Sequence, residues 1–289
     1  MIDINYIKLP ENKGSGYARQ YALCNTSCKY VSFIDSDDQL YNPYSLYLMH
    51  IKITESNDID FVTGGFIQEH DSCGHNTIPL SKVSKNNQTW VWGRLFSRDF
   101  LSSNNISFSD LRYNEDVLFM ELCFAFSKRN EFIKNTIYIW HYNETSLTRS
   151  PDGFLKKKSN GLVNFVDALS LSHIKKRELG IAKNEKSFEQ ACDGLCMCYW
   201  YFIKIYNEDR NECERFLKAY QKFYNLVTED FGSITATEQI KKSYFASTGT
   251  ATEVSETIVP QFTLWEVLSD LEDNKNEVEF DENCKYQFG

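Results

Sequence analysis

The residues best suited to chemistry are Asp35, Asp37 and Asp38, three carboxylates within four residues of the segment KYVSFIDSDDQL. Like charges this close repel one another, so packing gives no reason to gather them, whereas a divalent cation would neutralise them. Oxygen ligands suit Mg²⁺ or Mn²⁺, and Mg²⁺ commonly binds through one or two protein carboxylates together with substrate phosphates. The segment therefore predicts a site for a metal ion and a diphosphate.

An acidic turn that caps the next segment is the alternative, because Asp and Ser favour turns and helix N-termini. Two other acidic patterns fit less well. An EF-hand loop starting at Asp35 would need Gly at position six and Glu at position twelve, where this chain has Leu40 and Leu46. The nucleophile strand of a haloacid-dehalogenase-like phosphatase would have Gly and Thr where Gln39 and Leu40 stand.

The segments around the aspartates predict how they are positioned. The apolar run Val31–Ile34 predicts a strand buried on both faces, as in a parallel α/β sheet. The acids then lie at its carboxyl end, where open α/β sheets place ligands. Upstream, Asp3–Leu9 alternates like a strand, and the glycine-containing segment 12–16 leads into a helix carrying Arg19. Such a turn into a helix is one way to hold phosphate.

A second acidic pair, Glu115 and Asp116, precedes the apolar segment Val117–Phe126, which predicts a largely buried helix. The helix dipole favours ionised carboxylates at this end, so simple capping is one explanation for the pair. The last predicted strand of this half, Ile137–Tyr142, carries His141 near its end. Titratable groups therefore recur at the ends of predicted elements.

Two domains are expected: an α/β domain over residues 1–150 and a mostly α-helical region over residues 151–289. Helical spacing of apolar residues predicts helices over the ranges Phe154–Leu179, Ser187–Tyr206 and Glu208–Thr228. Polar composition predicts loops or disorder over the ranges His70–Gln88, Phe245–Pro260 and Glu272–Gly289.

Composition bounds the function. The chain has 289 residues and a formal charge of −9, which argues against general nucleic-acid binding. No apolar run approaches the roughly 18 residues of a membrane span, and the start lacks the pattern of a signal peptide. Nine cysteines scattered among apolar residues indicate free thiols in a reducing compartment. A cytoplasmic location is expected.

Taken together and in order, the motifs resemble those of family 2 glycosyltransferases, which have the GT-A fold. The matching segments are Asn12–Gly14 with Ala18–Gln20 (N-x-G and A-R-N), Phe33–Asp38 (F-I-D-x-D-D), Trp92–Phe96 with Phe100–Leu101 (W-x-K-L-F and F-L), Asn114–Asp116 (E-D) and Tyr138–Ser146 (Y-x-Y/H and S). The resemblance covers roughly residues 3–150. It implies a GT-A-like mixed sheet followed by a helical C-terminal region.

On the donor side, the resemblance implies that Asp35 and Arg19 contact the nucleotide of a nucleotide-diphosphate sugar, with a UDP-sugar expected. Asp37 would bind Mn²⁺ or Mg²⁺ between the two phosphates. His141 is similar to the histidine that completes the metal site in polysaccharide-synthesising members.

On the acceptor side, the resemblance implies that Asp116, with Glu115, is the general base that deprotonates a hydroxyl of a glycan or other acceptor. Trp92 would form part of the acceptor wall. The implied reaction is a metal-dependent sugar transfer by a single displacement, which inverts the anomeric centre.

One departure from the family pattern is large. Family members begin with a strand carrying P-x-(Y/F)-N, a helix and a second strand, and this sequence starts after these elements. A mis-called start, a split gene, a partner chain or second copy that supplies the strands, and true loss would each explain it. A degenerate, non-catalytic binding or assembly protein is therefore the alternative function.

Overall fold

The computed structural model describes residues 4–70, 74–78, 89–109, 114–143, 158–208, 213–247 and 264–273. The described residues up to Tyr142 form one compact unit, and the described residues from Asn143 onward form another. The predicted domain boundary near residue 150 lies outside the described residues.

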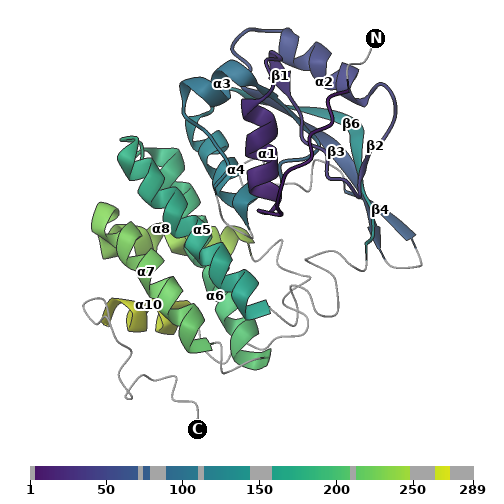
Figure 1. Ribbon diagram of the computed structural model, residues 1–289. Coiled ribbons are helices and arrows are strands. Elements are labelled where there is room, and N and C mark those ends of the chain that lie inside the picture. Colours follow the sequence, from purple (N-terminus) through teal and green to yellow (C-terminus); the bar gives the residue numbers. More distant parts are fainter. Residues whose placement is uncertain are drawn as a thin grey trace. The chain divides into compact units, whose positions relative to one another are not determined.

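A mixed β-sheet forms the centre of the first unit (Figure 1). Its strands are β1 (Tyr30–Val31), β2 (Gln39–Leu40), β3 (Phe61–His70), β4 (Gly74–Ile78), β5 (Arg94–Ser97) and β6 (Asn130–Trp140). The spatial order is β1-β5-β3-β6-β2, and β4 pairs with β3. Only β3 and β6 run parallel among these pairs, with a register shift at Gly65, and the other pairs are antiparallel.

Helices cover both faces of this sheet, because its central strands bury both sets of alternating side chains. Along β3, Phe61 packs with one apolar cluster and Val62 packs with another. The first cluster takes residues from α1 (Ser15–Cys24), α3 (Arg98–Ser103) and α4 (Glu115–Phe126). The second takes Met49 and Ile53 from α2 (Ser45–Thr54). The sheet is thus the middle of three layers.

Gly16 and Asn114 allow α1 to pack closely against the start of α4. A Cβ atom at Gly16 would lie 2.8 Å from the carbonyl oxygen of Ser109 and 2.9 Å from Cγ of Glu115. Only glycine allows this approach without a shift of backbone. At the other side of the contact, Asn114 precedes α4 with φ of 60°, a left-handed conformation that Asn tolerates better than most residues.

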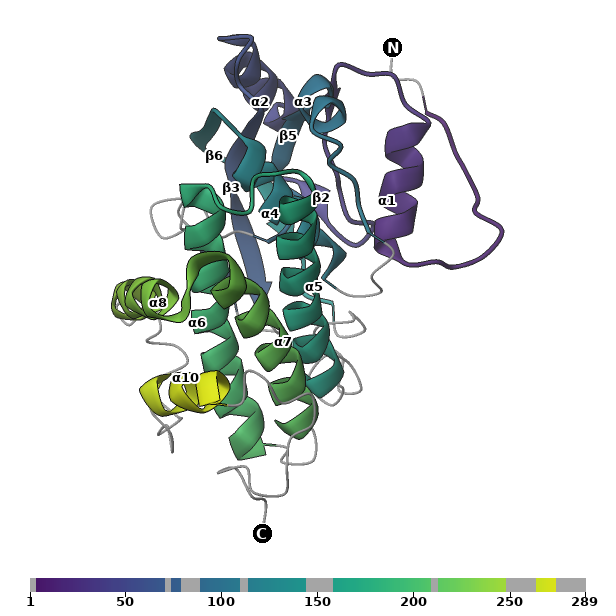
Figure 2. The ribbon, with the colours of Figure 1, turned by 90° about the vertical axis from the view of Figure 1, so that its left-hand side faces the viewer.

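The second unit is helical, as predicted. Its described helices are α5 (Lys158–Glu178), α6 (Glu185–Glu208), α7 (Cys213–Phe231), α8 (Ser233–Ser247) and α10 (Leu264–Asp273). Helices α5, α6 and α7 lie side by side (Figure 2). Buried aromatic rings such as Tyr199, Phe202 and Tyr220 fill the space between helices, so they belong to the core. None of the described helices is both long and apolar enough to cross a membrane.

Two predicted strands are wrong in detail. Residues 4–9 adopt no regular structure, and Ile4 and Tyr6 are 88% and 83% exposed. A segment of alternating apolar and polar residues becomes a strand only where a neighbouring strand pairs with its backbone N–H and C=O groups. No described strand pairs with these residues. The run Val31–Ile34 contributes only Val31 to β1, which pairs antiparallel with β5, while Phe33 forms an isolated bridge to Trp92.

Two predicted loops also contain regular structure. Within His70–Gln88, the described residues 74–78 form β4, and backbone pairing with β3 outweighs their polar composition. Helix α8 continues to Ser247, inside the segment predicted as a loop from Phe245. Most of the acidic tail, residues 274–289, lies outside the described residues.

Candidate active site

Arg19 joins two of the predicted site residues. Its guanidinium lies 2.5 Å from Oδ1 of Asp35 and 2.6 Å from Oε1 of Glu115. Glu115 also accepts a 2.5 Å hydrogen bond from Oγ of Ser15. Burial alone would lower the pKa of Arg19, but the two carboxylates outweigh it and raise that pKa. The loop after β1 and the start of α4 are therefore held together by one permanently charged side chain from α1.

Asp116 is the next residue after Glu115 and lies beside this cluster. Its Oδ1 accepts a 2.9 Å hydrogen bond from the backbone N–H of Val117. Burial and the adjacent charge of Glu115 raise the pKa of Asp116 to about 7, against a smaller opposing effect of Arg19. A carboxylate with a pKa near neutrality is suited to take a proton and give it up again.

The loop that carries Asp35, Asp37 and Asp38, called the acidic loop below, is anchored to β6 through Asp38. The Tyr138 hydroxyl donates a 2.8 Å hydrogen bond to Oδ2 of Asp38 and accepts a 3.1 Å hydrogen bond from the backbone N–H of Asp35. The backbone N–H of His141 donates to Oδ1 of Asp38 at 2.9 Å. Burial raises the pKa of Asp38, and these two donors oppose the rise. Asp37, between the two anchored aspartates, is exposed.

His141 has its ring fixed by a carboxylate. Its Nδ1 lies 2.8 Å from Oε2 of Glu69, near the end of β3, and the same oxygen accepts a 3.2 Å hydrogen bond from the backbone N–H of Tyr142. When Nδ1 carries the proton toward a carboxylate, Nε2 presents its lone pair, which is the usual arrangement of a metal-binding histidine. No group of three His, Cys, Asp or Glu side chains that could hold a metal is found within the described part of the chain.

Trp92 lies in an aromatic stack and is only 7% exposed. Its ring stacks on Tyr138 at 4.7 Å between centroids and on Trp90 at 5.3 Å, while Phe66 meets it edge-on at 4.9 Å. The stack supports the tyrosine that anchors the acidic loop. An acceptor contact by Trp92 stays a prediction, and little of its ring is available for one.

Sequence patterns alone assign no role to Glu69, Tyr138 or Ser15. Glu69 carries the same kind of signal as the aspartates, an acid near the end of a strand. Tyr138 belongs to a motif that is recognisable as a whole but does not indicate a role for this hydroxyl. Ser15 resembles any other loop serine, and only its contact with Glu115 distinguishes it.

Comparison with solved structures gives the fold. The chain has the GT-A fold of S. aureus TarS: the crystal structure of TarS 1–349 in complex with UDP-GlcNAc matches with a TM-score of 0.55 and 17% identity, over 85% of this chain and 74% of that one. The crystal structure of TarS 1–349 in complex with UDP matches with a TM-score of 0.52 and 16% sequence identity, over 85% of this chain and 73% of that one.

A family model and two curated relatives match this chain by sequence. Residues 2–109 match the model of glycosyl transferase family 2. The uncharacterized glycosyltransferase EpsJ of Bacillus subtilis (strain 168) is 24% identical over 59% of this chain and 56% of its own length. The uncharacterized glycosyltransferase YibD of Escherichia coli (strain K12) is 20% identical over 53% of this chain and 48% of its own length. The chain thus spans about half the length of these curated relatives, and its residues 2–109 are similar to the family 2 glycosyltransferases.

Proposed function

We propose that this protein transfers a sugar from a nucleotide-diphosphate donor, a UDP-sugar, to a hydroxyl group of a glycan acceptor. The observation that carries the proposal is the Arg19 bridge between Asp35 and Glu115, with Asp116 and its raised pKa immediately beside it. This arrangement brings an acidic loop suited to a metal–diphosphate next to a carboxylate suited to accept a proton. The family match and the fold shared with a UDP-binding protein support the same reaction.

On the donor side, Asp35 and Arg19 would contact the nucleotide, and Asp37 and His141 would hold a divalent cation. The exposed carboxylate of Asp37 would supply an oxygen ligand and the carboxylate-oriented imidazole of His141 a nitrogen ligand, and both ligand types suit Mn²⁺. When bound, the cation neutralises charge on the departing diphosphate. Tyr138 holds the loop that carries Asp35 in place, so the nucleotide side is arranged before the donor arrives.

On the acceptor side, Asp116 accepts the hydroxyl proton as the hydroxyl oxygen attacks the anomeric carbon. The new glycosidic bond forms as the bond to the diphosphate breaks, so a single displacement inverts the anomeric centre and releases UDP. Glu115 is held by Arg19 and Ser15, and its part is to fix α1 against the start of α4. Trp92 supports Tyr138 through ring stacking, and its place in the acceptor wall stays a prediction.

The test is calorimetric titration of UDP, with and without Mn²⁺, into the protein and its Asp37→Ala variant. We expect Mn²⁺-dependent binding that weakens at least about tenfold in the variant, the effect of losing one charged metal ligand. The Asp58→Ala variant, which removes an exposed carboxylate paired with Arg129 instead, should bind like the unmodified protein. Undiminished UDP binding by Asp37→Ala would contradict the proposal. Acceptor-dependent release of UDP from a UDP-sugar would exclude a purely structural protein.

A further inference from the structure

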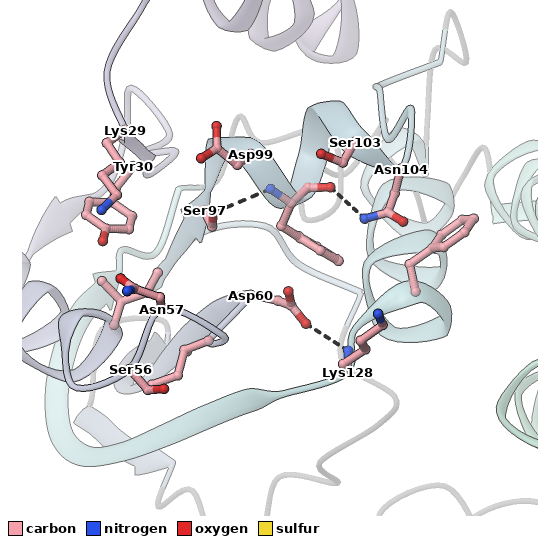
Figure 3. Close-up of a pocket in the computed structure, with 14 residues that line it drawn as sticks. Lys29, Tyr30, Ser56, Asn57, Asp60, Ser97, Asp99, Ser103, Asn104 and Lys128 are labelled. Carbon is pink, nitrogen blue, oxygen red and sulfur yellow. Dashed lines mark hydrogen bonds between the residues drawn. The ribbon is translucent and has the colours of Figure 1, made fainter.

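A cavity of about 480 Å³ lies in the first unit (Figure 3). Its volume falls within the roughly 300–1,000 Å³ typical of small-molecule sites. Its walls come from β1, from the end of α2, from α3 and from the residues just before β3 and β6. None of the predicted site residues lines it, so it is a different place from the acidic loop.

The cavity is at the opposite end of β3 from the predicted metal site. Asp60, which lines the cavity, comes just before Phe61, the first residue of β3, whereas Glu69 near the other end contacts His141. Glu69 lies eight positions after Phe61 along the strand, and a rise of about 3.3 Å per residue places them about 26 Å apart. A ligand in the cavity is therefore distant from the proposed site of sugar transfer.

The charges around the cavity exclude a strongly anionic ligand. Two lysines, Lys29 and Lys128, are balanced by Asp60 and Asp99. The Asp60 carboxylate is already engaged, because Oδ2 accepts hydrogen bonds from the backbone N–H groups of Lys128 and Arg129 at 2.7 and 3.0 Å. A phosphate or nucleotide site would need an excess of cationic groups directed at the ligand. The balance here favours a neutral ligand.

The remaining polar groups suit a ligand rich in hydroxyls. Asn57 and Asn104 face the cavity from two sides, and the exposed carboxylate of Asp99 lies on the α3 side (Figure 3). Amides both donate and accept, and a carboxylate accepts, so together they match groups that do both, as sugar hydroxyls do. Tyr30 adds a partly buried ring on another wall, contacted edge-on by His50 at 5.6 Å and with Nζ of Lys29 over the ring at 5.4 Å from its centroid. An apolar sugar face would pack against the part of the ring that these two groups leave uncovered.

We propose that this cavity is a non-catalytic binding site for a neutral glycan. The binding itself stands on the cavity alone, and the identification of that glycan with the acceptor or the product rests on the proposed function. A glycan held here and at the transfer site at once would be bound at two points of one chain. Two linked contacts raise the effective concentration of the acceptor without new chemistry.

Saturation-transfer NMR with cellobiose, maltotriose and chitobiose, one at a time, tests the proposal on the full chain. We expect at least one of these sugars to receive saturation, and its affinity, measured by calorimetry, to fall about tenfold in Asn57→Ala and in Asp99→Ala, the effect of one lost hydrogen bond. Both positions are exposed, and thermal melting checks that the variants stay folded. The Asp37→Ala variant should keep the sugar affinity unchanged.

The outcomes separate this proposal from the proposed function. Sugar binding lost in the cavity variants and retained in Asp37→Ala supports the second site whether or not UDP binds. The absence of a signal from all three sugars at millimolar concentration with folded protein overturns it. Equal sugar affinity in the unmodified protein and in both cavity variants overturns it as well, because the contacts must then lie elsewhere.

Discussion

Two charged clusters, one in each unit, use similar groups in opposite proportions. In the first unit a single Arg19 bridges two carboxylates, Asp35 and Glu115. In the helical unit one carboxylate, Asp230, accepts from Nε of Arg177 at 2.7 Å and lies 2.8 Å from Nε2 of His173, while the other acidic partner of Arg177, Glu229, is exposed.

The two clusters differ in the ratio of acidic to basic groups, and this ratio distinguishes a ligand-binding cluster from a structural one. The first cluster has more acid than base, and the further acids Asp37 and Asp116 lie close in the sequence. Such an excess costs stability, and a bound cation would compensate it. The second cluster has its carboxylate fully matched by protein groups, which is what burial demands when no ligand is involved. We therefore expect changes in the first cluster to alter activity and changes in the second to alter stability.

The largest effect is expected from Asp116→Asn. Loss of the base should reduce transfer about 10³-fold, within the range attributed to general base catalysis, because the amide cannot accept the proton. Unfolding by urea at pH 8 should show equal or greater stability, since a pKa raised to about 7 means that the folded state disfavours the ionised form. The control is Glu121→Gln on the same helix. Loss of stability together with activity would assign Asp116 a structural role.

The same group sets the pH dependence of the reaction. Asp116 acts as a base only when ionised, so kcat/KM should rise with pH and level off above the pKa of about 7. A profile already flat from pH 5 upward would indicate that another group takes the proton.

Asp230→Asn should give the next largest effect, a decrease of about 2–4 kcal/mol in the free energy of unfolding, because Arg177 and the buried His173 lose their common partner. UDP affinity should be unchanged. Glu229→Gln is the matched control, since Glu229 is an exposed partner of the same arginine and its loss should cost less than about 1 kcal/mol. Similar losses in the two variants would contradict the contrast between the clusters.

Tyr138→Phe should weaken Mn²⁺-dependent UDP binding about tenfold with little change in stability. The hydroxyl that holds Asp35 and Asp38 is removed, while the stack on Trp92 is kept. Calorimetry measures the affinity, and Tyr142→Phe is the control. Unchanged affinity would show that the acidic loop keeps its place without this anchor.

The smallest effect concerns His173, which is 2% exposed and faces Asp230, Arg177 and Lys176. Burial lowers its pKa against the opposing effect of Asp230, so the folded state binds the proton less well than the unfolded state does. Its contribution to stability is present above the unfolded pKa of about 6.5 and is lost as the pH falls below that value. Urea unfolding at pH 7.5 and 5.5 should show this decline, and His173→Gln should reduce it.

These expectations depend on contacts that differ in how far sequence could reveal them. The start of α4 at Glu115 was predictable, because apolar spacing and capping are local signals. The helical second unit was predictable for the same reason. The Arg19–Glu115 pair, in contrast, is 96 residues apart in the sequence, and no local pattern specifies it. The family resemblance suggested that both residues matter but not that they meet.

Strands illustrate the same limit. An apolar run such as Val31–Ile34 indicates burial but does not say which neighbour supplies hydrogen bonds or in which direction it runs. The antiparallel partner β5 decided the outcome for Val31, and the absence of a described partner decided it for residues 4–9. Loop composition likewise could not reveal β4, whose pairing with β3 depends on tertiary structure.

The hydrogen bond that anchors the acidic loop also determines how late in synthesis the site can form. Asp38 and the hydroxyl of Tyr138 are separated by 100 residues, and the parallel pairing of β3 with β6 joins residues that are 69 to 72 positions apart, from Phe61 with Asn130 to Gln68 with Trp140. Domains tend to fold as units as the polypeptide leaves the ribosome, and contacts between distant residues form late. A nascent chain that ends before β6 therefore carries every aspartate of the DSDD segment without the ordered loop, so translation must pass residue 141 before the site exists.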